Sequence, residues 1–411
     1  MLSKVEVVSE EPPITVVGAG PCGSYAALTI ARQHVPVVVL EEHDRIGLPP
    51  HCAGHVGMRG LSRIGVSIPA DLIQTRIRGA RFYSPSCREL LLDHGSPVTY
   101  VLDRPKFDRW LARQASRHGA TYRLSSRVRS LTFKEGHPRL SIEALNRDFQ
   151  ALQSNLVIDA EGCPASLLKA ARLQWTNSAK IVSGAQVEVD NANSVSEEFV
   201  ELYFGREYAP GFFAWIIPKG YGSVKVGLAA RERDPVRLLN KFVSQHPVAS
   251  RKLRDCRMFN LTVHPVTLGG PILRTYTSGL LAVGDAASQV KPTTGGGIVT
   301  GLLCSRIAGE VGSEAWKHSN YTAEFLSTYQ DQWRKLVWKD FLLMRRIREY
   351  LDAMSDEKMN RLFELAHRTG VMSDLGALDD IDFQASSLLS LVKYPRALAR
   401  LLYLLFRTLD Q

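Results

Sequence analysis

The sequence predicts an α/β (α+β) fold: a Rossmann-type dinucleotide-binding domain with an inserted antiparallel-sheet domain and a helical C-terminal region. Three observations predict it. The chain opens with a strand, a glycine turn, a helix and a second strand; it changes to alternating, aromatic-rich segments between Ser183 and Leu261; and it ends in an amphipathic pattern from Asn320 to Gln411. A length of 411 residues allows two or three domains with a sizeable core.

The N-terminal elements have the order of a βαβ dinucleotide-binding unit. An apolar strand, a G-x-G-x-x-G turn, a helix and a second apolar strand follow one another: Ile14–Val17, Gly18–Gly23, Ser24–Gln33 and Val35–Leu40. Glu41 ends the second strand, where its carboxylate can accept hydrogen bonds from ribose hydroxyls. The alternative is a glycine-rich turn in an α/β protein that binds no nucleotide.

Each glycine of this turn has its own physical reason. Gly18 permits the tight turn, Gly20 lets the backbone approach a pyrophosphate, and Gly23 lets the helix pack on the strand. The helix N-terminus then faces the phosphates.

The middle of the chain predicts an antiparallel sheet, with strands Gly184–Val189, Phe199–Phe204, Phe212–Ile217 and Val224–Leu228. On a strand, Phe213 and Trp215 would point to one face and Phe212 to the other. We therefore divide the chain into residues 1–182 and 271–318 for the nucleotide-binding domain, 183–270 for the inserted substrate domain, and 319–411 for the helical region.

A second nucleotide-binding element follows the insert. A buried strand delivers Gly284 and Asp285, and Gly295, Gly296 and Gly297 then open another helix whose positive end can face an electron-rich ring. Asp285 is placed to bind a ribityl hydroxyl. The alternative for Asp285 is a helix N-cap.

Composition excludes several classes of protein. Hydrophobic residues at 45% and charged residues at 22% are globular values. The net charge of +10 favours anionic surfaces such as phospholipid headgroups, but no Lys/Arg block indicates nucleic acid. The six cysteines form no C-x-x-C pair, which predicts a reducing compartment and no metal site. The N-terminus does not resemble a signal peptide, and the uncharged run Pro12–Ala31 is broken by glycines and prolines, so we expect a cytoplasmic protein without a membrane span.

These motifs together resemble the FAD enzymes of the hydroxylase superfamily, and within it the geranylgeranyl reductase family, which includes archaeal digeranylgeranylglycerophospholipid reductases. The resemblance covers most of residues 14–350. It is carried by Asp103-Arg104-Pro105, Pro49-Pro50-His51-Cys52-Ala53-Gly54, Tyr203-Phe204-Gly205, Pro210 with Phe213–Gly220, and the spacing from Asp285 to Gly297.

The resemblance implies a cofactor and a set of site residues. It implies that FAD is bound by Gly18, Gly20, Gly23, Glu41, Arg104 and Asp285, together with the second glycine element of Gly284, Gly295, Gly296 and Gly297. It also implies that Tyr203, Phe213 and Trp215 line a lipid cavity.

The sequence departs from the family pattern at three places. Phe213 and Ile217 stand where the family has Tyr and Phe in Tyr-x-Trp-x-Phe-Pro, so a phenol and one ring are missing. Glu161 replaces Asp in Ala-Asp-Gly, and the serine that normally follows is displaced to Ser166. The departure at Phe213 argues against proton donation from that position.

The residues agree with the reduction of an unactivated alkene. Adding a proton and a hydride to an isolated double bond passes through carbocation-like character, so the site needs apolar walls with π faces, which Phe213 and Trp215 can supply. Ordinary core packing is the alternative for these rings. Cys52, His51 and His55, in the loop Glu42–Gly60, are candidates for proton delivery, against the alternative of a buried loop cysteine and hydrogen-bonded structural histidines.

Three other functions compete with this hypothesis. An FAD monooxygenase would use the same cofactor motifs on an aromatic substrate. A flavin halogenase is suggested by Phe213-x-Trp215-x-Ile217-Pro218, but no lysine occurs between Lys4 and Lys106, where that family keeps its catalytic lysine. A prenyl-binding escort protein would need no flavin, so the intact glycine elements argue against it.

The partners are expected to be a prenylated phospholipid, as substrate, and an external electron donor. One nucleotide fingerprint and no Fe–S spacing leave ferredoxin, NAD(P)H and a deazaflavin open as donors. The segment Ala397–Arg407 is apolar on a wide face with basic residues nearby, which favours either peripheral association with a membrane surface or packing on the protein's own core.

Overall fold

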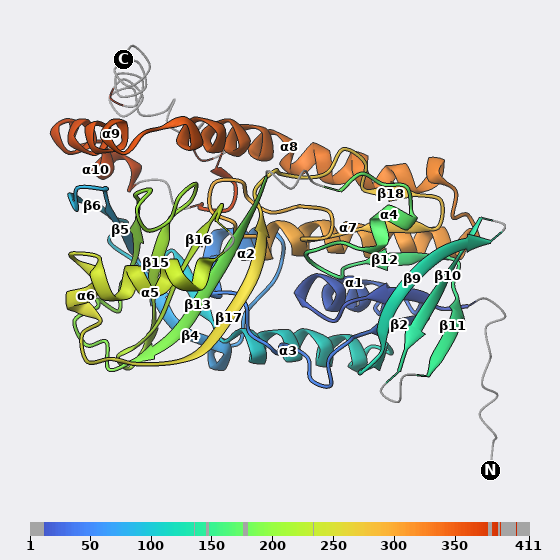
Figure 1. Ribbon diagram of the computed structural model, residues 1–411. Helices are drawn as coiled ribbons and strands as arrows, with labels where there is room; N and C mark the ends of the chain where they lie inside the picture. Colours follow the sequence, from blue (N-terminus) through green and yellow to red (C-terminus); the bar gives the residue numbers. More distant parts are fainter. Residues whose placement is uncertain are drawn as a thin grey trace.

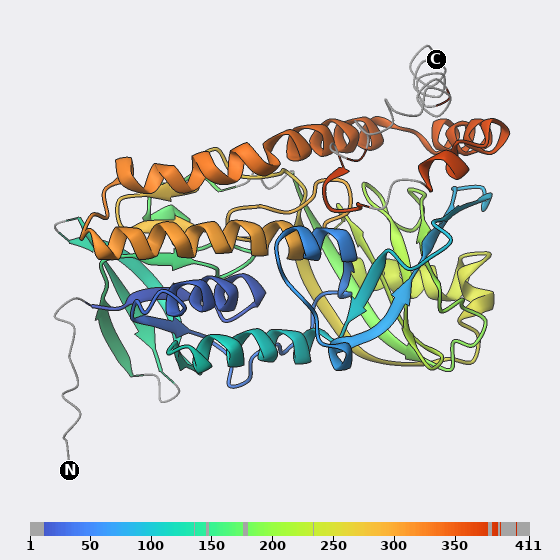
Figure 2. The same cartoon turned by 180° about the vertical axis from the view of Figure 1, so that it is seen from behind.

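The computed structural model describes residues 12–134, 136–144, 148–175, 180–232, 234–376, 380–384, 387 and 400. Two main sheets lie at the two ends of the molecule, and the long helix α8 (Ala323–Ala353) runs along one side across both (Figures 1 and 2). Within the described residues, no helix is long and apolar enough to cross a membrane. The segment Ala397–Arg407 lies outside the described residues except for Arg400.

The first main sheet has six strands. Its order is β18 (Tyr276–Thr277), β19 (Leu280–Ala282), β12 (Val157–Asp159), β1 (Ile14–Val17), β2 (Val37–Leu40) and β8 (Thr121–Arg123). All neighbours are parallel except the edge pair of β18 and β19. Because the parallel strands end at the same edge, Gly18, Glu41, Glu161 and Asp285 all follow strands on that edge, as the sequence predicts for a Rossmann-type sheet.

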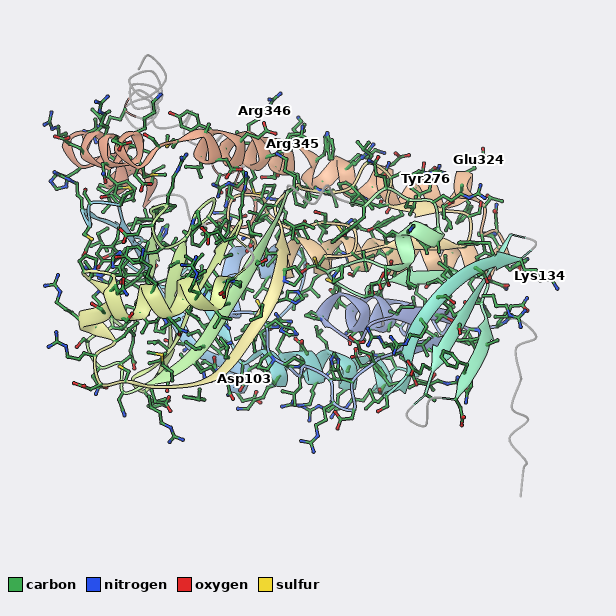
Figure 3. The ribbon with its side chains drawn as sticks, viewed as in Figure 1. Asp103, Lys134, Tyr276, Glu324, Arg345 and Arg346 are labelled. Atoms are coloured by element: carbon green, nitrogen blue, oxygen red, sulfur yellow. The ribbon has the colours of Figure 1, made fainter. Side chains whose placement is uncertain are left out.

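Both faces of the six-stranded sheet are covered. Ile14 and Val16 contribute to the core shared with α1 (Pro21–Ala31) and α7 (Ile298–Lys317), while Val17 packs on the other side. That other side carries α4 (Leu167–Ala170) and a three-stranded sheet of β9 (Arg127–Lys134), β10 (His137–Glu143) and β11 (Phe149–Gln153). The α3 helix (Arg104–Arg117) packs against α1, and Asp103 lies at its start (Figure 3). The Asp103 side chain caps the helix by accepting a hydrogen bond from the Lys106 amide at 3.1 Å.

The second main sheet has seven strands. Its order is β17 (Arg257–Thr267), β13 (Ile181–Asp190), β16 (Ser223–Ala230), β15 (Ala214–Gly220), β14 (Phe199–Tyr203), β5 (Gly79–Tyr83) and β6 (Glu89–Asp93). The sheet is antiparallel as predicted, with the exception of the parallel pair of β5 and β14. The sequence did not predict that β5 and β6, which come much earlier in the chain, join this sheet. The domain boundaries given above remain predictions.

The two faces of the seven-stranded sheet differ in what covers them. One face packs on α5 (Pro235–Gln245) and α6 (Ala249–Lys252), with Val226 and Leu228 in that core. The opposite face carries Trp215 and Ile217 and contacts Ala53 of the loop that follows β2. We call it the site face, because its neighbours are the loop and the helix starts of the first domain.

The remaining elements join the two sheets. A small sheet of β3 (His55–Gly57), β7 (Thr99–Leu102) and β4 (Ile73–Ile77) lies between them with α2 (Met58–Arg63) and the short 3₁₀ helix Ala70–Leu72. The helices α9 (Asp356–Thr369) and α10 (Val371–Leu375) contact β6, so the predicted helical C-terminal region reaches over the second sheet. Arg345 and Arg346 lie on the outer side of α8 (Figure 3).

Candidate functional site

The turn between β1 and α1 has the geometry that its glycines predict. Gly18 has a φ of +96°, and a Cβ there would lie 2.4 Å from the Ala160 carbonyl oxygen. A Cβ at Gly23 would lie 1.9 Å from the Gly18 carbonyl oxygen, so only glycine fits. A Cβ at Gly20 would meet nothing within 4 Å. The space beside Gly20 is therefore open, as a pyrophosphate that approaches the backbone requires.

The helices α1 and α7 begin without a side-chain cap. Their N-cap residues are Gly20 and Gly297, whereas the other described helices of eleven or more residues have side-chain caps from Asp103, Asp234, Thr322 and Ser355. The first N–H groups of α1 and α7 thus lack the partner that a capping side chain supplies, and helix N-termini of this kind bind anions. Both uncapped ends begin at the predicted glycine elements.

Two carboxylates follow the strands at the carboxyl edge. Glu41 Oε2 accepts a hydrogen bond from the Ala19 amide at 2.8 Å, and Oε1 lies 2.6 Å from Nδ1 of His43. Asp285 is half-buried and accepts no side-chain hydrogen bond from the described residues. Burial raises the pKa of Asp285, while the Arg104 guanidinium opposes this rise. An unpaired carboxylate beside an uncapped helix start fits the hydroxyl groups of a bound FAD.

Arg104 stands between the cofactor residues and the loop that carries Cys52. Its guanidinium forms two hydrogen bonds of 3.0 Å with the carboxylate of Asp108, one turn further along α3. Burial lowers the pKa of Arg104, but the neighbouring Asp108 and Cys52 outweigh that effect and raise it. The arginine is thus fixed by Asp108 with its charge near both Cys52 and Asp285.

The three candidate residues of the loop, His51, Cys52 and His55, lie in two different places. The His51 ring stacks on His264 of β17 with 4.6 Å between ring centroids, and Lys225 Nζ donates a hydrogen bond to the Cys52 carbonyl oxygen at 2.9 Å. His55 instead lies on β3, with Nε2 2.7 Å from the Thr99 hydroxyl. The structure therefore brings His51 and Cys52 to the site face and holds His55 in the small sheet.

The pKa values of both histidines lie below the ordinary value of 6.5. Partial burial lowers the pKa of His51 to about 4, and electrostatic interactions with His264, His43 and Arg104 lower it further. Burial also lowers the pKa of His55 to about 4, as does the charge of Lys291. A neutral imidazole with so low a pKa is a poor proton donor at neutral pH. Among the three candidate residues, the Cys52 thiol therefore remains the candidate for proton delivery.

The aromatic residues on the site face are arranged differently from the prediction. The strand β15 begins at Ala214, so Phe212 and Phe213 precede it in the turn. Their rings stack with centroids 4.1 Å apart, and the Phe213 and Trp215 centroids lie 6.2 Å apart. The expectation that Phe212 points away from Phe213 was wrong, because strand alternation does not apply outside the strand. All three rings share one apolar cluster.

Trp215 is held in place by both polar and steric contacts. Its Nε1 donates a hydrogen bond to Gln186 Oε1 at 3.3 Å, and its ring lies over Gly227 of β16. A Cβ at Gly227 would lie 2.6 Å from the indole, so glycine makes room for the ring.

Tyr203 lies on the other face of the seven-stranded sheet. Its side chain is 2% exposed, stacks on Tyr83 at 4.6 Å between centroids, and contacts the edge of Phe242 of α5. Its hydroxyl donates a hydrogen bond to Glu201. We infer a packing role for Tyr203 and leave it out of the substrate site, because strand alternation places it opposite Leu202, which pairs with Trp215.

Two departures from the family pattern meet in the structure. Ser166 Oγ donates to Glu161 Oε2 at 2.7 Å, and the Leu167 amide donates to Glu161 Oε1 at 2.7 Å. The longer Glu161 side chain thus caps the start of α4 and holds the displaced serine. Burial and the charge of Glu161 raise the pKa of the neighbouring Asp159 well above its ordinary value.

Sequence reasoning missed several residues of the site. Lys225 and Gln186 reach the site face from strands that were predicted without site roles, and His264 reaches it from β17, which was not predicted. A lysine inside the apolar run Val224–Leu228 was a signal that could have been used, because a buried lysine needs a partner. No sequence signal pointed to His264.

Comparison with known proteins agrees with this geometry. The family described as FAD binding domain matches residues 11–310, which confirms the predicted cofactor. Digeranylgeranylglycerophospholipid reductase 2 of Methanopyrus kandleri is 34% identical over 87% of this chain and 91% of its own length. The protein of the same name from Methanothermobacter thermautotrophicus is also 34% identical, over 94% of this chain and 97% of its own.

Solved structures share the fold along the chain. A geranylgeranyl bacteriochlorophyll reductase-like protein from Thermoplasma acidophilum is 25% identical, with a TM-score of 0.81, and the match covers 95% of this chain and 98% of that one. The p-nitrophenol 4-monooxygenase of Pseudomonas putida has a TM-score of 0.67 at 16% identity, over 94% of this chain and 98% of its own. At that identity the monooxygenase shares the fold alone.

Proposed function

This chain belongs to the geranylgeranyl reductase family of FAD-dependent enzymes, which includes the archaeal digeranylgeranylglycerophospholipid reductases, and we propose that it saturates isoprenoid C=C bonds in geranylgeranyl chains of archaeal-type ether phospholipids. The enzyme class is an FAD-dependent oxidoreductase acting on CH–CH groups. Relatives at 34% identity carry reductase names, whereas the monooxygenase shares only the fold.

One observation carries the proposal: the apolar site face meets the Cys52 loop at the cofactor end of the first domain. Ala53 packs with Trp215 and Ile217, and the next residue toward the N-terminus, Cys52, is tied to Lys225 of the same sheet. An apolar wall, a thiol and the uncapped start of α7 therefore lie in one region, since Phe212 also lies 3.6 Å from the Cβ position of Gly295.

The residues of this region have separable tasks in the reaction. Reduced FAD, when bound, supplies a hydride. Gly18, Gly20, Gly23, Gly284, Gly295, Gly296 and Gly297, with Glu41, Arg104 and Asp285, would hold the cofactor. Phe213 and Trp215 exclude water from the double bond and present π faces to developing positive charge.

The second hydrogen arrives as a proton from Cys52. The S–H bond breaks, one alkene carbon takes the proton, and the other carbon takes the hydride, so the double bond becomes a single bond. The Cys52 sulfur keeps the electron pair and regains a proton from water after release of the product. Arg104 stabilises the sulfur while it is negative.

The test is a lipid assay with the full-length chain. FAD-loaded protein is reduced with dithionite in the absence of oxygen and incubated with a digeranylgeranyl glycerophospholipid. The mass of the lipid is then measured by mass spectrometry. Gains of two hydrogens for each double bond support the proposal. A gain of one oxygen after admission of air indicates a monooxygenase, and an unchanged lipid that copurifies with colourless protein indicates an escort protein; either result would overturn it.

We further propose that the lipid is taken from a membrane surface and that electrons come from a soluble donor. The basic, amphipathic segment Ala397–Arg407 supports the first part. Unchanged sedimentation with anionic liposomes after deletion of residues 391–411 would reject it. Replacing dithionite in turn by reduced ferredoxin, NAD(P)H and a reduced deazaflavin identifies the donor.

A further inference from the structure

The turn Lys291–Gly297, which we call the cofactor turn, connects β19 to the uncapped start of α7. Lys291 closes it through two main-chain hydrogen bonds, from its own amide to the Gly296 carbonyl at 3.0 Å and from the Gly295 amide to its carbonyl at 2.9 Å. Its aliphatic stem passes beside Gly296, where a Cβ would lie 2.9 Å from Lys291 Cε. The lysine stem therefore helps to shape the glycine backbone that leads into α7.

The charge of Lys291 is compensated from the far end of the chain. Its Nζ lies 2.6 Å from Asp382 Oδ1 and donates to the Ile381 carbonyl at 3.3 Å. The side chains of Lys291 and Asp382 are 7% and 4% exposed. A buried ion pair loses much solvation energy and is weak evidence for stability, so its presence beside a cofactor turn calls for another explanation.

Asp382 belongs to a short segment that we call the strap, residues 380–384. Its second oxygen, Oδ2, accepts a hydrogen bond from the Gly57 amide at 3.0 Å. A Cβ at Gly57 would lie 2.4 Å from that oxygen and one at Gly60 2.6 Å, so both glycines leave room for the carboxylate. The aspartate thus bridges the cofactor turn and the β3–α2 junction.

Two neighbours of Asp382 anchor the strap. Phe383 is 1% exposed, with the Arg63 guanidinium 4.0 Å above its ring centroid. Gln384 Oε1 accepts a hydrogen bond from the Thr293 hydroxyl at 3.0 Å, which is a second link to the cofactor turn. The strap lies beyond residues 11–310, the part of the chain that matches the FAD-binding family.

We propose that Asp382 is a positioning residue of the flavin site: the strap delivers its carboxylate to Lys291 to hold the cofactor turn and to set the charge that bound FAD experiences. This inference rests on the FAD binding in the proposed function. Reduction adds negative charge to a flavin, so a nearby uncompensated cation favours the reduced form and an added anion disfavours it. In the native chain the two charges of the pair offset each other.

The test is the reduction potential of FAD bound to full-length variants, measured by spectroscopic titration without lipid. Asp382→Asn leaves the Lys291 charge uncompensated, so the potential should rise above that of the wild type. The double variant Lys291→Met/Asp382→Asn removes both charges, so its potential should return to the wild-type value. Equal potentials in Asp382→Asn and wild type, with FAD bound to both, would overturn the proposal.

Two control variants separate charge from loosened structure. Phe383→Leu weakens the strap without changing a charge, and should lower the melting temperature while the potential stays at the wild-type value. Glu201→Gln breaks another pair, Glu201–Lys252 at 2.6 Å, on the α5 side of the seven-stranded sheet, and should likewise leave the potential unchanged. The same rise in either control as in Asp382→Asn would refute the electrostatic role.

The reduction potential of bound FAD and the saturation of the lipid are measured independently, so the two proposals can fail separately. A potential that shifts as expected in protein that leaves the lipid unchanged would support the pair and reject the reductase. A lipid that gains hydrogens while Asp382→Asn keeps the wild-type potential would do the reverse. Wild-type protein that takes up no FAD would overturn both.

Discussion

Lys225 Nζ lies 2.9 Å from the main-chain carbonyl oxygen of Cys52, although 173 residues separate the two in the chain. Lys225 is buried on β16, and this burial lowers its pKa. The neighbouring Cys52 and Glu188 only partly offset that effect. A buried lysine that donates to a loop carbonyl fixes the loop, because the alternative leaves both groups without a partner. The distance from Cys52 to the site face is therefore set by a strand of the second sheet.

Replacement of Lys225 by Met should loosen the Cys52 loop without loss of the fold. Methionine keeps an unbranched apolar stem, but leaves the Cys52 carbonyl unpaired at a cost of about 1–3 kcal/mol. We expect kcat for lipid saturation to fall roughly tenfold while FAD occupancy stays complete. Lys241→Met, on the outer side of α5, is the control. Wild-type kcat in Lys225→Met would show that the bond does not position Cys52.

Cys52→Ala should abolish most proton delivery. Removal of a general acid lowers rates by about 10²–10⁴-fold, so oxidation of reduced FAD by the lipid should slow by about 100-fold or more. The spectrum of bound FAD should persist, since the cofactor residues are untouched. Cys256→Ala controls for loss of a thiol elsewhere. Lipid-dependent flavin oxidation at the wild-type rate would assign the proton to another group.

The sequence predicted the first strand, the glycine turn and the start of α1 because their determinants are local. Gly18, Gly20 and Gly23 act on neighbouring backbone, and the period of the flanking strands fixes where Glu41 ends up. The substrate end depends on contacts between distant segments. Tyr203 looked like a cavity residue by motif, yet the register of β14 turns it toward α5. Lys225 and Asp382 enter through pairings 173 and 91 residues apart, which no local pattern encodes.

Gly20→Ala should fold normally and bind FAD poorly. The φ of Gly20 is −64°, which any residue adopts, and the position of an added methyl group is open. The methyl would occupy the space that a pyrophosphate needs. We expect an unchanged melting temperature for the FAD-free chain and at least about a tenfold weaker FAD affinity. Equal FAD affinity of Gly20→Ala and wild type in a fluorescence titration would show that the pyrophosphate does not lie at this turn.

Trp215 should matter more for lipid turnover than for FAD binding. Trp215→Ala removes the ring over Gly227 and opens a void. Because Trp215 is only partly buried, the loss in stability should stay below the about 3–5 kcal/mol that a fully buried aromatic costs. Trp215→Phe keeps a π face with a smaller void, so turnover should fall less than in Trp215→Ala. FAD occupancy, melting temperature and lipid-dependent flavin oxidation separate these effects. Unchanged oxidation in both variants, with FAD bound, would show that Trp215 only packs the core.

The stability of the folded chain should depend on pH through His55. Burial lowers the pKa of the folded-state imidazole to about 4 from its ordinary 6.5, so above pH 6.5 both the folded and the unfolded chain hold it neutral. Between pH 6.5 and 4 the unfolded chain binds a proton that the folded chain resists. The contribution is therefore fully present above pH 6.5 and is lost as the pH falls, by an amount on the order of 3 kcal/mol.

His55→Gln isolates this contribution, because glutamine can keep a hydrogen bond to Thr99 but does not titrate. Urea unfolding with excess FAD, at pH 7 and pH 5, gives the drop in the free energy of unfolding for each chain. Other groups that titrate in this range, including His246, whose pKa burial also lowers to about 4, act equally in both chains and cancel. The drop should be smaller in His55→Gln than in wild type. Equal drops would mean that the folded chain protonates His55 near pH 6.5. His55 would then again be a candidate proton donor.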